Sequence, residues 1–239
     1  MNIYILLAHP DKTSFNGQLA DAYEQKLLLA GHQVRRQNIS EMQFDPVLWK
    51  GYSVIEQFEP DMQQTQENIL WCQKWVIIYP VWWGSVPAIL KGLLDRALLP
   101  GFGFKYHEKD PFWDQYLGKR SAHVITTSDA PAIWLWWQYG NSDIKAIRKA
   151  TLEFCGIKPV KVTRIGRVKY LDDDKRSNII RDIAADYFPF QSVCQKPFKK
   201  SGCSNWPKPF KQTLKTAFLI PKPNPGTSAW GLMSSAGIT

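Results

Sequence analysis

Residues Ile3–Leu19 read IYILLAHPDKTSFNGQL, and this segment decides the fold of the chain. Its first five residues are all apolar, which is typical of a parallel strand covered on both faces. A polar turn follows, and apolar side chains then recur at helical spacing over residues 14–30 until Gly31 ends the pattern. The segment therefore predicts a strand, a turn and a helix, which together form the first unit of an α/β fold.

The start of this predicted helix is a candidate anion site. A helix N-terminus presents N–H groups that lack intrahelical acceptors, together with about half a positive charge, so phosphate groups bind there. The hydroxyls of Thr13 and Ser14 and the amide of Asn16 would add donors. An ordinary serine N-cap would have the same sequence, so this segment alone leaves both interpretations open.

The alternation of strand and helix continues to about residue 187. The predicted strands are residues 2–8, 32–39, 75–79, 121–127 and 158–167, and the predicted helices are 14–30, 62–73, 87–97, 142–154 and 172–187. Two aromatic-rich segments, 100–113 and 128–141, are expected to be loops. Five such alternations predict an α/β fold with a five-stranded parallel sheet, right-handed crossovers and helices on both faces.

Charge and composition divide the chain into a domain over residues 1–187 and a tail over 188–239. The tail holds seven of the sixteen Pro and seven Lys but no acid, so it is expected to be a flexible, basic appendage. The chain has a net charge of +9, and without the seven tail lysines only about +2 remains on the domain. This low charge argues against a nucleic-acid partner.

Cysteine usage and hydropathy favour the cytoplasm. The four Cys form no CxxC pair and have no neighbouring His, so neither a metal site nor a disulfide framework is indicated. No apolar run reaches the roughly 18 residues of a membrane span, and the N-terminal residues lack the basic region of a signal peptide.

Three predicted strands lead into polar or aromatic segments. Ligands of parallel α/β sheets bind beyond the carboxyl ends of the strands. The candidate residues are His9, Ser14, Phe15 and Asn16 after the first strand, Pro80, Val81, Trp82, Trp83 and Gly84 after the third, and Thr126, Thr127, Ser128 and Tyr139 around the end of the fourth. The first set suits a phosphate and the others suit a planar ring. The chain lacks the GxGxxG and GxxxxGK[ST] motifs of Rossmann and P-loop sites.

Several long blocks of the sequence resemble the quinone-reductase family of flavoproteins, the NAD(P)H dehydrogenases (quinone), which have a flavodoxin-like fold. The blocks occur in the family's order and are LAHPDKTSFN, YPVWWGSVPAILKGLLDR, PGFGFKY, ITT followed by YGN, and FCGI. The resemblance as a whole covers about residues 1–187. The resemblance implies one flavin per subunit, FMN or FAD, with NAD(P)H as the electron donor. It also implies a homodimer with the active site at the subunit interface.

The resemblance further implies roles for the candidate residues. It assigns the flavin phosphate to His9 and residues 14–16, the isoalloxazine ring to residues 80–84, and the pyrimidine edge of the ring to backbone amides within residues 126–128. Tyr139 corresponds to a tyrosine that acts beside the reduced ring. This chain departs from the animal members in having Ser128-Asp129 where they have Gly-Gly, and in lacking a His in this loop.

The function implied by the resemblance is a flavin-dependent NAD(P)H:quinone oxidoreductase that transfers hydride by a ping-pong mechanism to a quinone-like acceptor. Two alternatives stay open. One is a flavodoxin-type electron carrier, although such carriers are strongly acidic. The other is an ancillary regulatory subunit of a membrane potassium-efflux system. Among the remaining polar residues, His123 is expected to be a satisfied core residue, and Asp95 and Arg96 are expected to be solvated helix charges.

Overall fold

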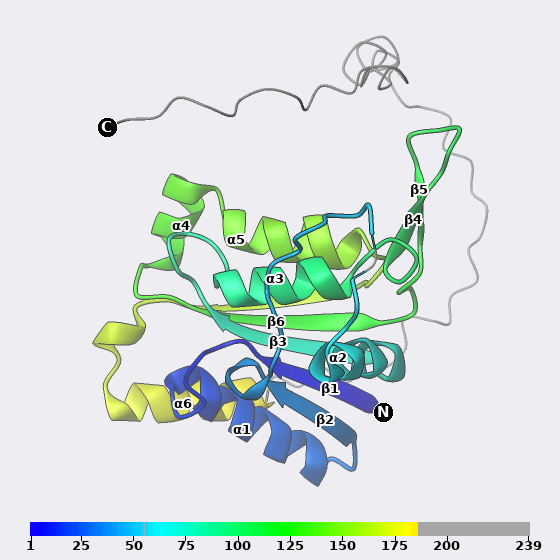
Figure 1. Cartoon of the computed structure of the whole chain (residues 1–239). Coiled ribbons are helices and arrows are strands. Elements are labelled where there is room, and N and C mark those ends of the chain that lie inside the picture. Colours follow the sequence, from blue (N-terminus) through cyan, green and yellow to red (C-terminus); the bar gives the residue numbers. More distant parts are fainter. Residues whose placement is uncertain (55, 186–239) are drawn as a thin grey trace, which may run out of the picture. The chain divides into compact units, whose positions relative to one another are not determined.

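Five parallel strands form the central sheet in the computed structural model, which describes residues 1–54 and 56–185 (Figure 1). The strands are β1 (Asn2–Leu7), β2 (Gln33–Asn38), β3 (Lys74–Pro80), β6 (Ser121–Thr127) and β7 (Val160–Ile165). Their order across the sheet is β2-β1-β3-β6-β7, which is the flavodoxin-like order and confirms the predicted fold class. The tail predicted for residues 188–239 lies outside the described residues.

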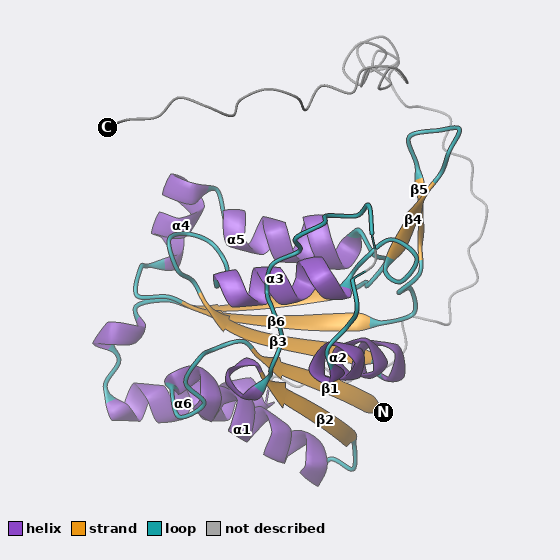
Figure 2. Cartoon of the chain, in the orientation of Figure 1, coloured by secondary structure: helices purple, strands orange, loops and turns teal. Residues whose placement is uncertain are grey.

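Helices cover both faces of the sheet (Figure 2). The helices are α1 (Phe15–Leu29), α2 (Pro60–Trp71), α3 (Ala88–Ala97), α4 (Ala132–Tyr139), α5 (Ser142–Ile144), which continues into the π-helix η2 (Lys145–Glu153), and α6 (Asp173–Ala185), with short 3-10 turns η1 (Ile39–Glu41) and η3 (Val168–Tyr170). Helices α1 and α6 pack on one face, and α2, α3 and η2 pack on the other. The sheet is therefore the middle layer of three.

The three central strands, β1, β3 and β6, are almost fully buried because both of their faces are covered, whereas the edge strands β2 and β7 are only partly buried. Alternate residues of β1 face opposite layers: Ile5 packs with α1, whereas Tyr4 and Leu6 pack with α2 and α3. Every residue of β3 and β6 is buried. His123, in the middle of β6, bonds through its two ring nitrogens to the hydroxyls of Tyr23 and Thr163 at 3.0 and 2.8 Å, so its prediction as a satisfied core residue is confirmed.

Two segments predicted to be loops contain regular structure. Residues 100–113 include β4 (Phe104–Tyr106), which pairs with β5 (Trp113–Gln115) as an antiparallel hairpin. Strands of three residues are too short to show an alternating pattern. Residues 128–141 include α4, which has no polar face to mark it as amphipathic. Both loop predictions were wrong for these reasons.

Candidate functional site

A cleft of about 190 Å³ opens beyond the carboxyl ends of β1, β3 and β6. It is lined by His9, Ser14, Phe15, Asn16, Pro80, Val81, Trp82, Thr127, Ser128, Asp129 and Val168. The strand order reverses between β1 and β3, and ligands of open α/β sheets bind at such a switch point. Nine of the thirteen predicted site residues line this cleft.

The N-terminus of α1 forms one end of the cleft. Ser14 is the N-cap, and its Oγ accepts a hydrogen bond from the backbone N–H of Gly17 at 3.3 Å. A Cβ atom at Gly17 would lie 1.8 Å from the carbonyl oxygen of Lys12, so only glycine lets the preceding turn pack this closely. Ser14, Phe15 and Asn16 at this N-terminus line the cleft, and the first N–H groups of a helix have no intrahelical acceptors.

The turn between β1 and α1 is ordered by its own side chains. The Asp11 carboxylate accepts hydrogen bonds from the backbone N–H and the hydroxyl of Thr13, both at 2.7 Å, and these bonds lower the pKa of Asp11. The backbone N–H of Asp11 donates to His9 Nδ1 at 2.9 Å. Thr13 therefore uses its hydroxyl within the turn, whereas the other two predicted donors, Ser14 and Asn16, line the cleft.

Asn16 carries an amide with one side satisfied and the other without a partner. Its Oδ1 accepts from Thr127 Oγ1 at 2.8 Å, which ties the start of α1 to the end of β6. Its Nδ2 is buried and has no hydrogen-bond partner within the described residues. A buried N–H without an acceptor is costly, so this position favours a ligand that brings an acceptor oxygen. A phosphate at a helix N-terminus is such a ligand.

The segment after β3 forms a two-residue turn at the rim of the cleft. Trp82 and Ser85 exchange two backbone hydrogen bonds, at 3.0 and 2.9 Å. The residues between them, Trp83 and Gly84, have φ angles of 52° and 68°, which is the geometry of a type I′ turn. Trp82 extends along the cleft, with its ring centroid 6.2 Å from that of His9. Trp83 points into solvent and is fully exposed.

Four predicted site residues lie outside the cleft lining, and they are Trp83, Gly84, Thr126 and Tyr139. Tyr139 is the last residue of α4, and its ring covers Gly84, where a Cβ atom would approach the ring to 3.1 Å. Thr126 is fully buried. Its neighbour Thr127 points to the α1 face, so Thr126 points to the opposite face of the sheet.

The loop after β6 uses some of its own donors internally. The backbone N–H of Ser128 donates to the carbonyl of Ile165 at 2.9 Å, and its hydroxyl donates to the carbonyl of Ala130 at 2.8 Å. The Ser128 amide predicted to face a ring edge is therefore engaged with β7. Asp129 lines the cleft, and its carboxylate accepts from the backbone N–H of Lys169 at 3.0 Å.

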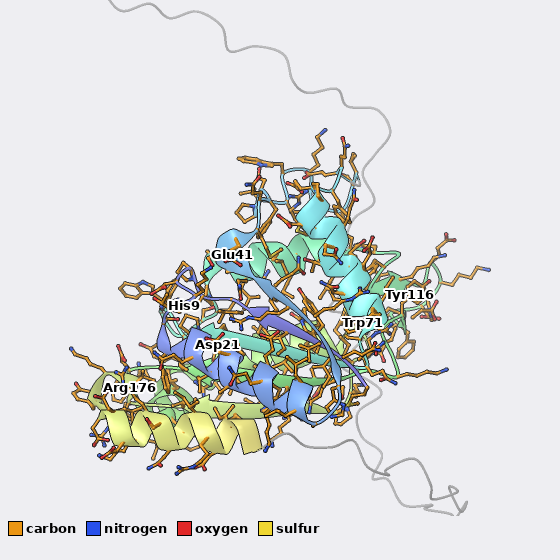
Figure 3. The ribbon with its side chains drawn as sticks, turned by 90° about the horizontal axis from the view of Figure 1, so that it is seen from below. His9, Asp21, Glu41, Trp71, Tyr116 and Arg176 are labelled. Carbon is orange, nitrogen blue, oxygen red and sulfur yellow. The ribbon has the colours of Figure 1, made fainter. Side chains whose placement is uncertain are left out.

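Sequence reasoning missed two lining residues, Asp129 and Val168. Val168 lies in η3, after β7, and it reaches the cleft only because β7 pairs with β6. The guanidinium of Arg176 donates to the Val168 carbonyl at 3.2 Å and lies 5.6 Å from the centre of the Phe15 ring. Figure 3 shows His9 and Arg176 at the same end of the molecule. The unusual Ser128-Asp129 pair was the one sequence signal for Asp129.

Helix α4 carries an exposed apolar surface, and its last residue, Tyr139, packs on Gly84, two residues after the cleft-lining Trp82. The members of this surface are the exposed large side chains of this helix: Ile133, Trp134, Trp136, Trp137 and Tyr139. Leu135 is the buried residue of α4. Apolar surface of this extent is typical of a site of interaction. We call these five side chains the α4 surface.

No helix within residues 1–54 and 56–185 is long and apolar enough to cross a membrane. In the same described part of the chain, no group of three or more His, Cys, Asp or Glu side chains is placed to hold a metal ion.

Two known proteins are similar to this chain in sequence. An uncharacterized NAD(P)H oxidoreductase of Haemophilus influenzae is 28% identical over 186 residues, which are 75% of this chain and 91% of the relative. NAD(P)H dehydrogenase [quinone] 1 of Cavia porcellus is 26% identical over 202 residues, covering 74% and 72% of the two chains. These relatives agree with the resemblance inferred from the sequence blocks.

Solved structures have the same fold. The crystal structure of Smu.1420 from Streptococcus mutans has a TM-score of 0.66 and 28% identity and covers 77% of this chain and 97% of that one. The NAD(P)H:quinone oxidoreductase of Methanothermobacter marburgensis has a TM-score of 0.65 and 24% identity, covering 77% and 96%. Residues 1–187 match the family described as having a flavodoxin-like fold. The chain therefore belongs to this family of proteins with a flavodoxin-like fold.

Proposed function

We propose that this protein is a flavin-dependent NAD(P)H:quinone oxidoreductase that binds FMN or FAD in the cleft beyond β1, β3 and β6. The observation that carries the proposal is the buried, unpartnered Nδ2 of Asn16 at the N-terminus of α1. A flavin phosphate would supply the acceptor that this amide lacks. The names of the related oxidoreductases support the same conclusion.

The residues present fit the flavin at both ends of the cleft. Ser14 and the first N–H groups of α1 would hold the phosphate together with Asn16. Pro80, Val81 and Trp82 would lie beside the ring, and the loop after β6 would border its polar edge. When bound, the flavin would supply two-electron hydride chemistry, which amino-acid side chains do not provide.

The side chains of this site orient the reactants and exclude water. Trp82 lines the cleft, and the ring of Tyr139 packs on Gly84, two residues farther along the same turn. The Asn16–Thr127 hydrogen bond fixes the distance between the phosphate end and the β6 loop. Tyr139 is half-exposed at the rim, where a nicotinamide or a quinone would enter, and we propose it as the catalytic tyrosine.

Two measurements test this proposal. Acid release followed by chromatography identifies the bound flavin and separates FMN from FAD. Steady-state oxidation of NAD(P)H with a soluble quinone should give parallel double-reciprocal plots, the signature of a ping-pong mechanism. An electron carrier would bind flavin but show no such turnover.

A variant at the α1 N-terminus tests the position of the phosphate. Ser14→Glu places a carboxylate at the N-cap and should abolish flavin retention through repulsion of the phosphate. Ser177→Glu, on the exposed surface of α6, is the matched control and should leave retention unchanged. Unchanged flavin absorbance in purified Ser14→Glu would contradict the proposal.

We also propose a homodimer in which the α4 surface meets a second copy of the chain. The exposed aromatic side chains of α4 lie next to the turn that carries Trp83, so a partner seated there would complete the wall of the cleft. The β4–β5 hairpin, which carries the PGFGFKY block, is proposed to approach the partner's site.

A further inference from the structure

A row of polar side chains crosses the sheet behind the cleft. Tyr79 on β3 is the register partner of Thr126 on β6, and Thr126 is the register partner of Arg164 on β7. Register partners on neighbouring parallel strands point to the same face of a sheet. Tyr79 packs in the core beneath α3 and η2, so all three side chains face that layer.

Each member of this row has a polar atom without a partner. The atoms are the Tyr79 hydroxyl, the Thr126 hydroxyl and Nη1 of Arg164, and none has a hydrogen bond of normal geometry within the described residues. All three are shielded from solvent, and the side chain of Arg164 is only 9% exposed. Each buried polar atom without a hydrogen-bond partner costs folding free energy. Three such atoms on neighbouring strands suggest one shared partner.

The charge of Arg164 is already balanced. Its Nη2 donates to both carboxylate oxygens of Asp143, at 2.8 and 2.9 Å, and the Asp143 side chain is 1% exposed. Burial and the nearby Asp143 carboxylate raise the pKa of Tyr79, so its hydroxyl keeps its proton. The Thr126 hydroxyl lies close enough to oppose this shift, as does the Arg164 guanidinium, but the two hydroxyls share no hydrogen bond of normal geometry. The cluster is therefore neutral and rich in donors, and it would admit an anion only by burying an uncompensated charge.

We propose that an ordered internal water molecule bridges Tyr79, Thr126 and Arg164. The water would accept hydrogen bonds from the Tyr79 hydroxyl and from Nη1 of Arg164, and it would donate one to the Thr126 hydroxyl. Buried waters in proteins make about three hydrogen bonds to otherwise unsatisfied polar groups, which is the number of partners available here.

The position of this water links it to the cleft. Tyr79 and Thr126 directly precede Pro80 and Thr127, which line the cleft. Asp143 lies in the first turn of the helix that begins at Ser142, and the Ser142 hydroxyl donates to the Gly84 carbonyl at 2.7 Å. The bridged row therefore fixes two strand ends and the start of that helix against one another.

The water is tested directly in the unaltered protein. A long-lived internal water should give a nuclear Overhauser effect between water and the methyl protons of Thr126. A high-resolution crystal structure should show density within hydrogen-bond distance of all three atoms. Absence of both signals, or direct bonding among the three side chains, would overturn the proposal.

A double-mutant cycle tests the shared partner independently. Tyr79→Phe and Thr126→Val should each raise the unfolding equilibrium constant about tenfold. The double variant should raise the unfolding equilibrium constant by much less than the product of the two single effects. The reason is that the first substitution already removes the bridge. Urea denaturation measures all four proteins.

The control cycle pairs Thr126→Val with Tyr4→Phe. Tyr4 is also a buried tyrosine, but its hydroxyl donates directly to Gln37 Oε1 at 2.7 Å. The effect of Tyr4→Phe on the unfolding equilibrium constant should multiply with the effect of Thr126→Val. Multiplicative effects in both cycles would show that Tyr79 and Thr126 share no water.

Discussion

Gly17 is the residue at which the smallest substitution should disturb the cleft most. In Gly17→Ala the added methyl group would collide with the backbone of Lys12, so the turn before α1 must move. We expect FMN affinity to fall at least about tenfold and the unfolding free energy to fall by about 1–3 kcal/mol. Fluorescence titration and urea denaturation measure these effects.

Gly118→Ala is the matched control for Gly17→Ala. A Cβ atom at Gly118 would meet no atom within 4 Å, and its φ angle is not in the left-handed region. This variant should bind FMN like the parent. Parental FMN affinity in Gly17→Ala would show that the position of the turn does not matter for binding.

Residue roles were predictable where they follow from local sequence. Ser14 was a recognisable N-cap because a helical pattern follows it directly. Arg96 was predicted to be solvated, and this was wrong: its side chain is buried and donates to the Asp45 carbonyl at 2.6 Å and to Glu59 at 2.7 Å. Both partners lie at least 37 residues earlier in the chain, so helical spacing could not reveal them.

At the scale of elements, the Trp82–Ser85 turn holds a tryptophan in a backbone conformation that suits asparagine or glycine. Trp83→Asn should raise the unfolding free energy by about 1 kcal/mol, because the left-handed region costs asparagine less and the exposed indole makes no packing contacts to lose. Urea denaturation measures the gain. Trp83→Phe keeps the unfavourable backbone and should show no gain, and an equal gain in both variants would contradict the explanation.

The contact between α3 and the loop before α2 depends on pH. The Arg96 guanidinium donates to Glu59 and lowers the pKa of Glu59 to about 2, although burial opposes this shift. Since the folded-state pKa lies below the unfolded value, the stabilisation is complete above about pH 4.5 and is lost as the pH falls through 2.

Glu59→Gln should therefore cost about 2 kcal/mol at pH 6, after allowance for the partial exposure of Glu59. The difference between parent and variant should shrink by more than half at pH 3. Urea denaturation at the two pH values measures it. Glu67→Gln, on the exposed surface of α2, is the control, and a pH-independent Glu59→Gln effect would contradict the assignment.

Long, periodic elements were predictable and short ones were not. Both ends of β6 were predicted, because its segment SAHVITT lies between the charged pair Lys119-Arg120 and the polar pair Ser128-Asp129. The β4–β5 hairpin depends on packing instead, with the Trp113 ring stacked 4.4 Å from that of Phe154. The exposed residues of α4 are apolar except for Gln138, so nothing in its own sequence distinguishes it from an aromatic loop.

At the scale of the whole molecule, the α4 surface is the site of the proposed dimer. Ile133 is 73% exposed and Trp137 is 69% exposed, which leaves a large apolar area in water unless a partner covers it. Ile133→Glu and Trp137→Glu should convert a dimer into a monomer, because each would bury an unpaired carboxylate in the interface. Analytical ultracentrifugation measures the mass.

Leu29→Glu is the control for the dimer. Leu29 is 86% exposed at the end of α1, and Figure 1 shows α1 and α4 on opposite sides of the sheet. Its substitution should leave the mass unchanged. A monomeric parent protein would contradict the proposed dimer, as would a dimer that survives both α4 substitutions.

The architecture of the molecule was predictable because strand and helix alternate regularly, but the order of the strands was not. That order depends on which strand each crossover reaches. It determines that β1 lies between β2 and β3 and that the switch point falls at the AHPDKTSFN turn. The fold class could therefore be predicted from the alternation of strands and helices. The place of Val168 in the cleft could not, because it depends on the pairing of β7 with β6.

The hydrogen bond between Asn16 and Thr127 joins residues that are 111 positions apart. During synthesis on a ribosome, the turn after β1 emerges long before β6, and Val168 emerges later still. The nascent chain thus has no complete cleft until nearly all of the domain has left the exit tunnel. The proposed flavin, if it needs the complete cleft, would therefore bind each newly made chain only after Val168 has emerged.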